Sequence, residues 1–543
     1  MLINRVILKF KNVTAKIDWK LLLFLILFLN VKIVVKLFAI LLIYLLRFNF
    51  KFGVRMKSPR LPLFYFLIIC TGIAGWLANG NYSDLNYNIS FICGIAGWVL
   101  CILAIHQLQL AVELNEINKI HYTIKVFFVL NAIVVLITYV QMVIGSGSLN
   151  PYLYQGQYQK YFINSGDKIR GISFDTSTAN AILNAMGVIY FLNRKKILMT
   201  LMCMIVLLLT TSNLTNFTLG IIFVYLFLFQ SNRLQKSVIT TCIALAIIFI
   251  VKVSPQNNQY ASDIFKNLFA RYNSKVSFLR IDPKTKKADT TDSTEKIKMT
   301  IARLYLDSIA AVYNKQNNKT EEAPRELKSF EPKIHTPPFQ RKKDTTAIQR
   351  ELRTVAIQVR ADSIFREDSS KERSFNGKML AYEQTLHFLK THPKKIIFGI
   401  GIGNFSSKLA FRTTGLGIAG KYPGRFTYIN NDFKINHLAD YLYFFSRDVQ
   451  LHSVLNTPNS VYNQLAGEYG LAGMLLFLIL YIGFFIKRLN RNSLIIPLLI
   501  LLLMVFSTEY WFEQFSIVII FELIALLTIK EAAEKNKVQI PNE

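Results

Sequence analysis

Long apolar segments separated by short polar loops dominate the sequence. Because the hydrocarbon core of a bilayer needs about 20 apolar residues per helix, we interpret ten of these segments as membrane-spanning helices. One polar stretch is much longer than the other loops and covers residues 254–463. The ten segments cover residues 61–78, 88–106, 125–144, 175–192, 197–212, 214–230, 237–253, 464–486, 493–508 and 513–530.

The segment 21–46 is also apolar, but Asn30, Lys32 and Lys36 interrupt it near its centre. A charge at the middle of the bilayer costs roughly 2.5–3.5 kcal/mol on insertion scales, so we do not expect one straight span here. Two arrangements stay open: a short hairpin with its lysines near the outer interface, or a segment that lies in the membrane without crossing it. The hairpin gives twelve spans and is preferred, and the second arrangement gives ten.

The distribution of Lys and Arg among the loops predicts the orientation of the chain. Basic loops alternate with loops that contain neither residue, and by the positive-inside rule the basic loops face the cytoplasm. The basic regions are the segment before residue 21 and the loops at 47–60, 194–196, 233–236 and 487–491, whereas 79–87, 212–213 and 509–512 contain no Lys or Arg. We therefore expect an all-α integral membrane protein with both termini cytoplasmic. It has about 12 (10–12) transmembrane helices and one large extracytoplasmic loop before the last three.

The composition agrees with this interpretation. Hydrophobic residues make up 52% of the chain, Phe occurs 42 times, and the formal net charge is +30. This combination excludes a disordered tail, a secreted disulfide scaffold and an ordinary cytosolic enzyme. Because the topology accounts for the positive charge, we expect no nucleic-acid partner. The five cysteines lie inside apolar runs and form no CxxC motif, so neither a disulfide framework nor a metal site is predicted.

The large loop changes in composition near residue 375. Residues 254–375 are polar and lysine-rich with short helical periodicities, and we interpret them as a partly ordered basic insertion. In residues 376–463 aromatic residues are interleaved with Arg, Lys, His and Asn, a mixture that suits a site for a sugar chain on a lipid diphosphate. The expected organisation is an N-terminal transmembrane bundle (1–253), the insertion (254–375), a catalytic-type loop (376–463), and C-terminal helices with a cytoplasmic tail (464–543).

Two glycine-rich motifs in this loop do not predict nucleotide binding. Gly399, Gly401 and Gly403 are spaced as GxGxG rather than GxGxxG, and no βαβ pattern surrounds them. The run GLGIAGK at 415–421 is followed by Tyr422, where a phosphate-binding loop needs Ser or Thr for magnesium. The chain also lacks a DxD pair and an HExxH motif. We therefore expect no metal and no cofactor.

Four segments of the chain resemble the O-antigen ligase and polymerase family of bacterial integral membrane glycosyltransferases. The plan of many spans with one large, late outside loop resembles that family as well, whereas the 254–375 insertion lies outside the resemblance. The four segments are RGISFDTSTANAIL (170–183), LLLTTSNLTNFTLG (207–220), PKKIIFGIGIGNF (393–405) and PNSVYNQLAGEYGLAGMLLF (458–477).

The resemblance implies metal-independent glycosyl transfer at the outer face of the bacterial inner membrane. The donor would be an oligosaccharide on a polyprenyl diphosphate, and the acceptor a sugar hydroxyl on another lipid-linked repeat, a lipid core or a protein. Membrane lipids and other polysaccharide assembly proteins are the further partners expected. Polymerase and ligase activities both stay open.

Departure of a polyprenyl diphosphate builds up negative charge, which preorganised cations stabilise best. Arg170 matches the family's arginine in an outside loop and is the first choice for binding the diphosphate, with Asp175 beside it to orient the guanidinium. In the large loop Lys378 and Tyr382 stand where the family has an arginine ahead of an aromatic residue. The alternative cations on the glycine-rich stretch are Arg412, Lys421 and Arg425.

An attacking hydroxyl benefits from a general base, which contributes about 10²–10⁴-fold. The family commonly has a histidine directly before the asparagine that opens the late helix, but here Pro458 precedes Asn459. His452 is the nearest substitute and His437 the next. Glu468 is the third catalytic candidate, since an acidic group inside the apparent membrane edge is costly unless it is paired or functional. For each the alternative is a structural role, which for Glu468 is a tether that pairs an arginine.

Two other function classes stay open. A transporter or flippase of lipid-linked glycan would line its spans with charge, whereas these spans are nearly free of charge. A non-catalytic scaffold of a polysaccharide assembly complex is the other alternative, because the family's histidine is missing.

Overall fold

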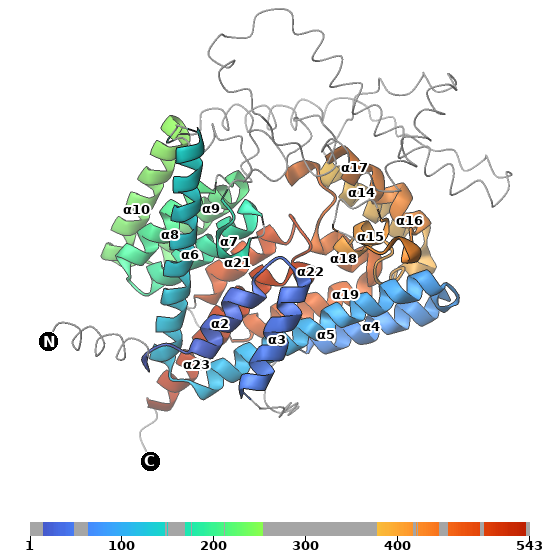
Figure 1. Ribbon diagram of the computed structural model, residues 1–543, viewed down its shortest axis with the longest axis horizontal. Helices are drawn as coiled ribbons and strands as arrows, with labels where there is room; N and C mark the ends of the chain where they lie inside the picture. Colours follow the sequence, from blue (N-terminus) through green and yellow to red (C-terminus); the bar gives the residue numbers. More distant parts are fainter. Residues whose placement is uncertain are drawn as a thin grey trace, which may run out of the picture.

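The computed structural model describes eleven stretches of the chain, and every regular element in them is a helix (Figure 1). The all-α prediction is therefore confirmed for these residues. The 254–375 insertion, Asp175, Lys421 and His452 lie outside the described residues. The described stretches are 15–47, 63–146, 149, 169–174, 176–210, 212–253, 377–415, 420, 422–444, 454–488 and 494–538.

The N-terminal half contains nine α-helices among its described residues, and short turns connect several of them. They are α2 (Trp19–Phe28), α3 (Ile33–Arg47), α4 (Phe64–Ala78), α5 (Leu85–Leu114), α6 (Ile117–Ser146), α7 (Ser177–Asn193), α8 (Ile197–Leu209), α9 (Asn213–Phe229) and α10 (Arg233–Ile248). Short 3-10 turns η1 (Asn81–Ser83) and η3 (Gly171–Ser173) precede α5 and α7, and the π-helical turn η4 (Phe249–Val253) follows α10.

The later half is more broken, because short turns separate most of its helices. Its first part holds α14 (Gly377–Thr391), η7 (Pro393–Lys395), α15 (Lys408–Thr413), η8 (Gly424–Phe426), α16 (Asn431–Phe433), the π-helical turn η9 (Lys434–Leu438), α17 (Ala439–Phe444) and η11 (Val454–Asn456). Its last part holds α18 (Val461–Glu468), α19 (Gly470–Leu476), the π-helical η12 (Phe477–Ile482), α20 (Gly483–Ile486), α21 (Ile495–Val505), α22 (Trp511–Gln514) and α23 (Ser516–Val538).

Polar residues start several of these helices in the way that helix termini require. The first amides of a helix have no partner within it, and a preceding Asp, Asn, Ser or Thr supplies one. Asp18 accepts from two amides of α2, Asp84 from two of α5, and Thr176 from the Ala179 amide of α7. Asn232 and Gln235 form a reciprocal capping box at the start of α10.

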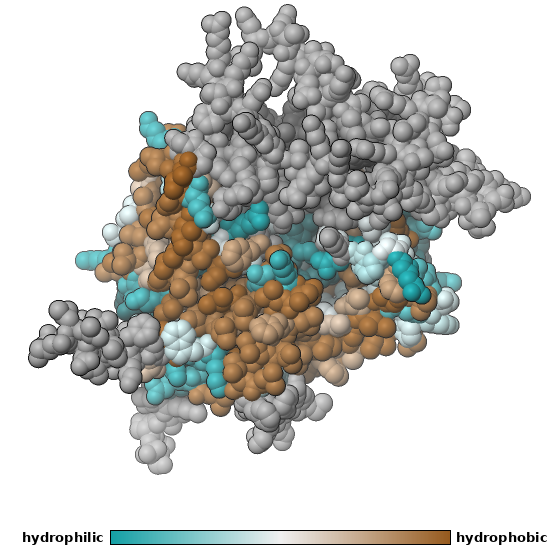
Figure 2. Space-filling view, viewed as in Figure 1, coloured by the Kyte–Doolittle hydropathy of each residue, from teal (hydrophilic) through white to brown (hydrophobic). Residues whose placement is uncertain are grey.

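Three described helices are long and apolar enough to cross a membrane, and the bent pair described below would make a fourth. They are Leu85–Leu114, Ile117–Ile144 and Arg233–Lys252. Many large apolar side chains point outward, among them Leu198, Val34 and Phe229, each more than two-thirds exposed. Figure 2 shows hydrophobic residues over much of the described face. These features support a membrane protein, since a soluble chain rarely exposes such large apolar patches.

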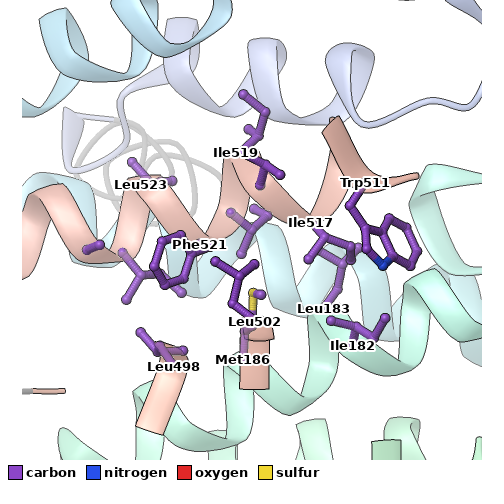
Figure 3. Packing of buried hydrophobic residues seen from close by; sticks show 14 of the residues in the cluster. Ile182, Leu183, Met186, Leu498, Leu502, Trp511, Ile517, Ile519, Phe521 and Leu523 are labelled. Atoms are coloured by element: carbon purple, nitrogen blue, oxygen red, sulfur yellow. The ribbon is translucent and has the colours of Figure 1, made fainter. Parts of the chain in front are cut away.

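Helices α7 and α23 form the centre of the bundle. Every residue of α7 from Ala179 to Leu192 is buried, because α8, α9, α21 and α23 pack around it. Ile182, Leu183 and Met186 face the apolar side chains of α21 and α23 (Figure 3). Helix α23 also packs on α5 and α6 and so connects the two halves of the chain.

The ambiguous segment 21–46 forms two helices, α2 and α3, which pack against each other. At the tip of this hairpin the Val31 amide donates to the Ser173 carbonyl of η3, 3.1 Å away. At the open end the Asp18 amide donates to Thr123 Oγ1 over 2.9 Å. The hairpin tip therefore lies beside the start of α7, and its N-terminal end lies beside the start of α6.

The end of the bundle opposite the hairpin tip gathers several polar residues. Lys530 of α23 donates to the carbonyls of Val112 and Asn115, at 2.8 and 2.7 Å. Arg194, just after α7, pairs with Glu531 of α23. The α5–α6 turn, the end of α7 and the end of α23 therefore lie together.

The segment predicted as one span at 464–486 is broken in the structure. Val454–Glu468 and Gly470–Ile486 meet at an angle of 111°, so the chain turns sharply between Glu468 and Gly470. Gly470 has φ +65°, which ends α18 and redirects the chain. Hydropathy alone did not predict this bend, because an average over 464–486 does not register a single backbone angle.

Candidate functional site

The glycine-rich turn at 396–404 packs directly on the break between α18 and α19. The amides of Ile400 and Gly401 donate to the carbonyls of Gly467 and Glu468, at 3.0 and 3.1 Å. In the other direction, the amide of Leu471 donates to the carbonyl of Ile396 at 2.8 Å. The turn thereby supplies hydrogen-bond partners for backbone amides and carbonyls that have no helical partner at the break. Two of the four resembling segments, 393–405 and 458–477, thus form one unit.

Glycine is needed on both sides of this contact. A β-carbon at Gly470 would lie 2.5 Å from the carbonyl oxygens of Ile396 and Ile397. A β-carbon at Gly399, where φ is +67°, would lie 2.4 Å from the carbonyl carbon of Glu468. Real β-carbons do not approach backbone so closely, so Gly399 and Gly470 allow the close backbone packing of the turn on the break. A β-carbon at Gly401 or Gly403 would instead meet the hydroxyl oxygen of Tyr87 or Ser90.

Helix α14 is joined to the start of α18 by a row of polar contacts. The Gly377 amide donates to Asn456 Oδ1 at 3.2 Å, and the Tyr382 and Ser460 hydroxyls lie 3.0 Å apart. One turn further on, Thr385 Oγ1 donates to Asn463 Oδ1 at 3.1 Å. Because Ser460 also caps α18, this row fixes the segment 456–463 against α14.

Lys378 lies in the middle of this row and is buried. Its Nζ donates to Thr457 Oγ1 at 3.2 Å and to the Asn459 carbonyl. These bonds leave one N–H of the ammonium group without an acceptor among the described residues. Burial lowers the pKa of Lys378 from 10.5 to about 7, an effect that the nearby Glu509 carboxylate only partly offsets. Lys378 therefore braces the turn that carries Pro458.

His437 lies next to this row in the π-helical turn η9. Its ring is fully buried and meets the Phe405 ring edge-on, with centroids 4.6 Å apart. Neither ring nitrogen has a hydrogen-bond partner among the described residues. Burial, and to a smaller extent the Lys378 ammonium, lower the pKa of His437 to about 3. The ring is therefore neutral at pH 7, with one donor nitrogen and one acceptor nitrogen.

Glu468 ends α18 and is fully buried at the break. Its Oε1 accepts from the Phe405 amide at 3.3 Å, and the Gly403 backbone and the Ser407 side chain also face the carboxyl group. The predicted alternative for Glu468 was a tether to an arginine. In the structure its contacts are with the glycine-rich turn, so it is placed to hold that turn on α18.

Two further carboxylates, Glu509 and Glu513, lie beside this site and were missed from the sequence. Asn459 Nδ2 donates to Glu509 Oε1 at 3.0 Å. Glu513 accepts from Gln464 Nε2 at 2.7 Å and from the Leu409 amide at 3.1 Å. Both are half-buried and lie at or after the short loop before α22. A signal was present, since the loop 509–512 holds an acid between two apolar segments.

Arg170 lies in a different part of the structure. It precedes η3, which packs mainly on α6 and α7 rather than on α14 or α18. Asn131 holds this turn: its Oδ1 accepts from the Ile172 amide at 2.9 Å, and its Nδ2 donates to Asn180 Oδ1 at 3.0 Å. The half-buried Arg170 therefore stands at the start of α7, beside the tip of the α2–α3 hairpin.

The remaining predicted cations differ in their surroundings. Arg412 of α15 is half-buried, and its charge and that of Lys408 act on Glu513. Arg425 in η8 is exposed, with its guanidinium over the Phe426 ring at 5.6 Å. The structure thus brings Lys378, His437, Glu468 and Arg412 into one region of the chain and leaves Arg170 apart. Within the described residues, no three His, Cys, Asp or Glu side chains form a metal-binding group.

No protein-family model, curated protein or solved structure matches this chain. What the site can do follows from its residues. Lys378, with a pKa of about 7, supplies a group that is partly cationic at neutral pH, and His437 a neutral ring. Glu509 and Glu513 supply carboxyl groups. Figure 1 shows α14–α18 side by side, next to the α4–α5 pair.

Proposed function

We propose that this protein is a membrane glycosyltransferase of the O-antigen ligase or polymerase type. It transfers or polymerises glycan from a polyprenyl diphosphate at the outer face of the bacterial inner membrane. The observation that supports this most directly is the position of Lys378. A buried lysine with two hydrogen bonds from its Nζ lies beside a fully buried histidine and a half-buried carboxylate, at the edge of a bundle with an apolar surface.

The chemistry needs a nucleophile, a route for its proton and a way to stabilise the leaving group. The acceptor hydroxyl attacks the anomeric carbon, the new glycosidic bond forms, and the bond from that carbon to the diphosphate oxygen breaks. The hydroxyl proton passes to a base, and the polyprenyl diphosphate leaves with the negative charge. In this proposal Lys378 and Arg412 stabilise that charge in the low-dielectric site. Arg170 stands on a separate turn, and its contact with the donor diphosphate stays a prediction from the sequence.

The proposed topology has twelve spans with both termini in the cytoplasm. It is supported by the helical hairpin at 19–47, whose tip contacts the Arg170 turn. It is also supported by the opposite end of the bundle, where Arg194 and Lys530 meet the end of α23 and the α5–α6 turn. If that end is cytoplasmic, as its basic residues indicate, Arg170 and the glycine-rich turn face outward.

The broken helix offers an argument against the transporter alternative. In many transporters, the free ends of discontinuous helices bind the substrate or its coupling ion. Here the carbonyls of Gly467 and Glu468 and the amide of Leu471 are bonded to the glycine-rich turn instead. The break therefore has fewer free backbone groups to offer to a substrate, which favours an enzyme site in the loop.

The test uses a deletion strain complemented with variants, with the chain-length distribution of the surface polysaccharide read from a gel. Wild type restores the ladder, whereas Lys378→Met abolishes it at an unchanged protein level in the membrane. Lys390→Met, on the exposed side of the same helix, is the matched control and restores the ladder. A wild-type ladder from Lys378→Met would remove the support for this site and favour the scaffold alternative.

A further inference from the structure

The two oxygens of the Glu509 carboxylate differ in their hydrogen bonds. Its Oε1 accepts from Asn459 Nδ2 at 3.0 Å and from the Tyr510 amide at 3.1 Å. No described residue donates a hydrogen bond to its other oxygen. The side chain is half-buried, so this second oxygen can meet a substrate without unfolding of the site.

The other carboxylates of the site lack this combination. Both oxygens of Glu513 accept hydrogen bonds, one from Gln464 and one from the Leu409 amide. Glu468 is fully buried and holds the Phe405 amide. Glu468 Oε2 also has no hydrogen-bond partner among the described residues, but Glu468 is fully buried. Glu509 is the half-buried acid of the three that combines two hydrogen bonds on one oxygen with a free second oxygen.

Glu509 is also joined to the cation of the site. Asn459 connects the two groups, because its carbonyl accepts from Lys378 Nζ while its side chain donates to Glu509. The Lys378 ammonium group and the Glu509 carboxylate lie close enough for their charges to interact. Glu509 and Lys378 therefore lie on two sides of Asn459. This arrangement suits a reaction in which one group takes a proton and the other stabilises the leaving group.

We infer that Glu509 is the general base that accepts the proton of the acceptor hydroxyl, a role that rests on the proposed glycosyl transfer. The free oxygen of Glu509 takes the proton as the acceptor oxygen bonds to the anomeric carbon. The bond from that carbon to the diphosphate oxygen breaks, and the diphosphate leaves beside Lys378. The proton returns to bulk water when the products depart, so Glu509 is regenerated.

The experiment measures glycan transfer by purified full-length protein in proteoliposomes. Membrane extract of the deletion strain supplies the polyprenyl-diphosphate-linked oligosaccharide and its acceptor. Glu509→Gln keeps the shape and the Asn459 contact but cannot take a proton, so kcat falls by about 10²–10⁴-fold with little change in KM for the donor. Glu116→Gln, an exposed acid on the α5–α6 turn, keeps the wild-type rate.

A second variant separates a base from a residue that only positions others. Glu509→Ala leaves space in which a small carboxylate can sit, so added sodium formate raises its rate, whereas formate has no effect on Glu509→Gln. A Glu509→Gln rate equal to wild type, or loss in Glu509→Ala without rescue by formate, overturns the inference and leaves the glycosyl transfer itself intact. Absence of transfer by wild type in this assay instead contradicts the proposed function.

Discussion

The amide of Leu471 donates a 2.8 Å hydrogen bond to the carbonyl of Ile396, and this contact joins the glycine-rich turn to the broken helix α18–α19. Non-helical backbone at the depth of a membrane is tolerated only where it is buried in protein or lines a wet cavity. Here the turn itself covers the break. The glycines therefore determine whether the loop that carries Lys378 and His437 sits correctly on the bundle.

Gly470→Ala should destabilise the protein by about 3 kcal/mol or more. The methyl group would lie 2.5 Å from two backbone carbonyl oxygens, and φ +65° adds a cost of about 1–3 kcal/mol for a non-glycine residue. The measurement is thermal unfolding in detergent together with the protein level in membranes. Gly97→Ala in α5 is the control, because its methyl group would meet no atom within 4 Å. Equal unfolding temperatures for the two variants would contradict the packing described here.

Lys378 should make the free energy of unfolding rise with pH above about pH 7. Its folded pKa of about 7 lies below the ordinary 10.5, so between these values the unfolded chain binds more protons than the folded one. Stability therefore rises with pH across this window, by up to about 1.4 kcal/mol per pH unit for a single group. Unfolding measured at pH 7, 8 and 9 should show this rise in wild type and in Lys390→Met. The rise should be absent in Lys378→Met, and a rise of the same size there would assign it to other groups.

The helices could be predicted from the sequence, but the site could be predicted only in part. Hydropathy predicted a helix at 61–78, and the structure has α4 at Phe64–Ala78. Such a helix is predictable because the length and the apolar character of the segment are properties of the local sequence. The break at Gly470 depends on one backbone angle and on a partner far away in the chain, and no local pattern encodes either. Glu509 was missed for a related reason: its role comes from Asn459 and Lys378, which the sequence places in other segments.

His437→Leu should reduce glycan transfer, because it removes the neutral donor and acceptor beside Lys378. It should not destabilise the fold. Because both ring nitrogens lack described partners, an apolar side chain of similar size removes an unsatisfied buried polar group, which is neutral or stabilising. The folded pKa of His437, about 3, lies below the ordinary 6.5, so the free energy of unfolding of the wild type falls as the pH drops from 6.5 toward 3. The free energy of unfolding of His437→Leu should fall less over the same range. Activity and unfolding at pH 7 and 5 are the measurements, and the exposed His387→Leu is the control. Full activity in His437→Leu would assign this histidine a purely structural role.

Reporter fusions should place the two polar ends of the bundle on opposite sides of the membrane. Asn81 Nδ2 donates to the Ile400 carbonyl at 3.0 Å, so the α4–α5 turn must lie on the side of the glycine-rich turn. Arg194 pairs with Glu531, so the α7–α8 turn must lie on the side of the C-terminal helix end. We expect fusions at Asn81 to read extracytoplasmic and fusions at Lys195 and Arg488 to read cytoplasmic. A cytoplasmic reading at Asn81 would place the candidate site on the wrong side for the proposed donor.

Arg170→Ala should abolish glycan transfer while the protein stays at its normal level in the membrane. The turn that carries Arg170 is held by Asn131 and Asn180 and by the hairpin tip, and these contacts stay in place in Arg170→Ala. Arg170→Lys should recover only part of the activity, because an ammonium group cannot bind two phosphate oxygens as a planar fork does. The measurement is the surface polysaccharide ladder in the complemented deletion strain, with the exposed Arg233→Ala as control. A wild-type ladder from Arg170→Ala would show that the donor diphosphate binds elsewhere, and Lys378 and Arg412 would then be the cations to test for that contact.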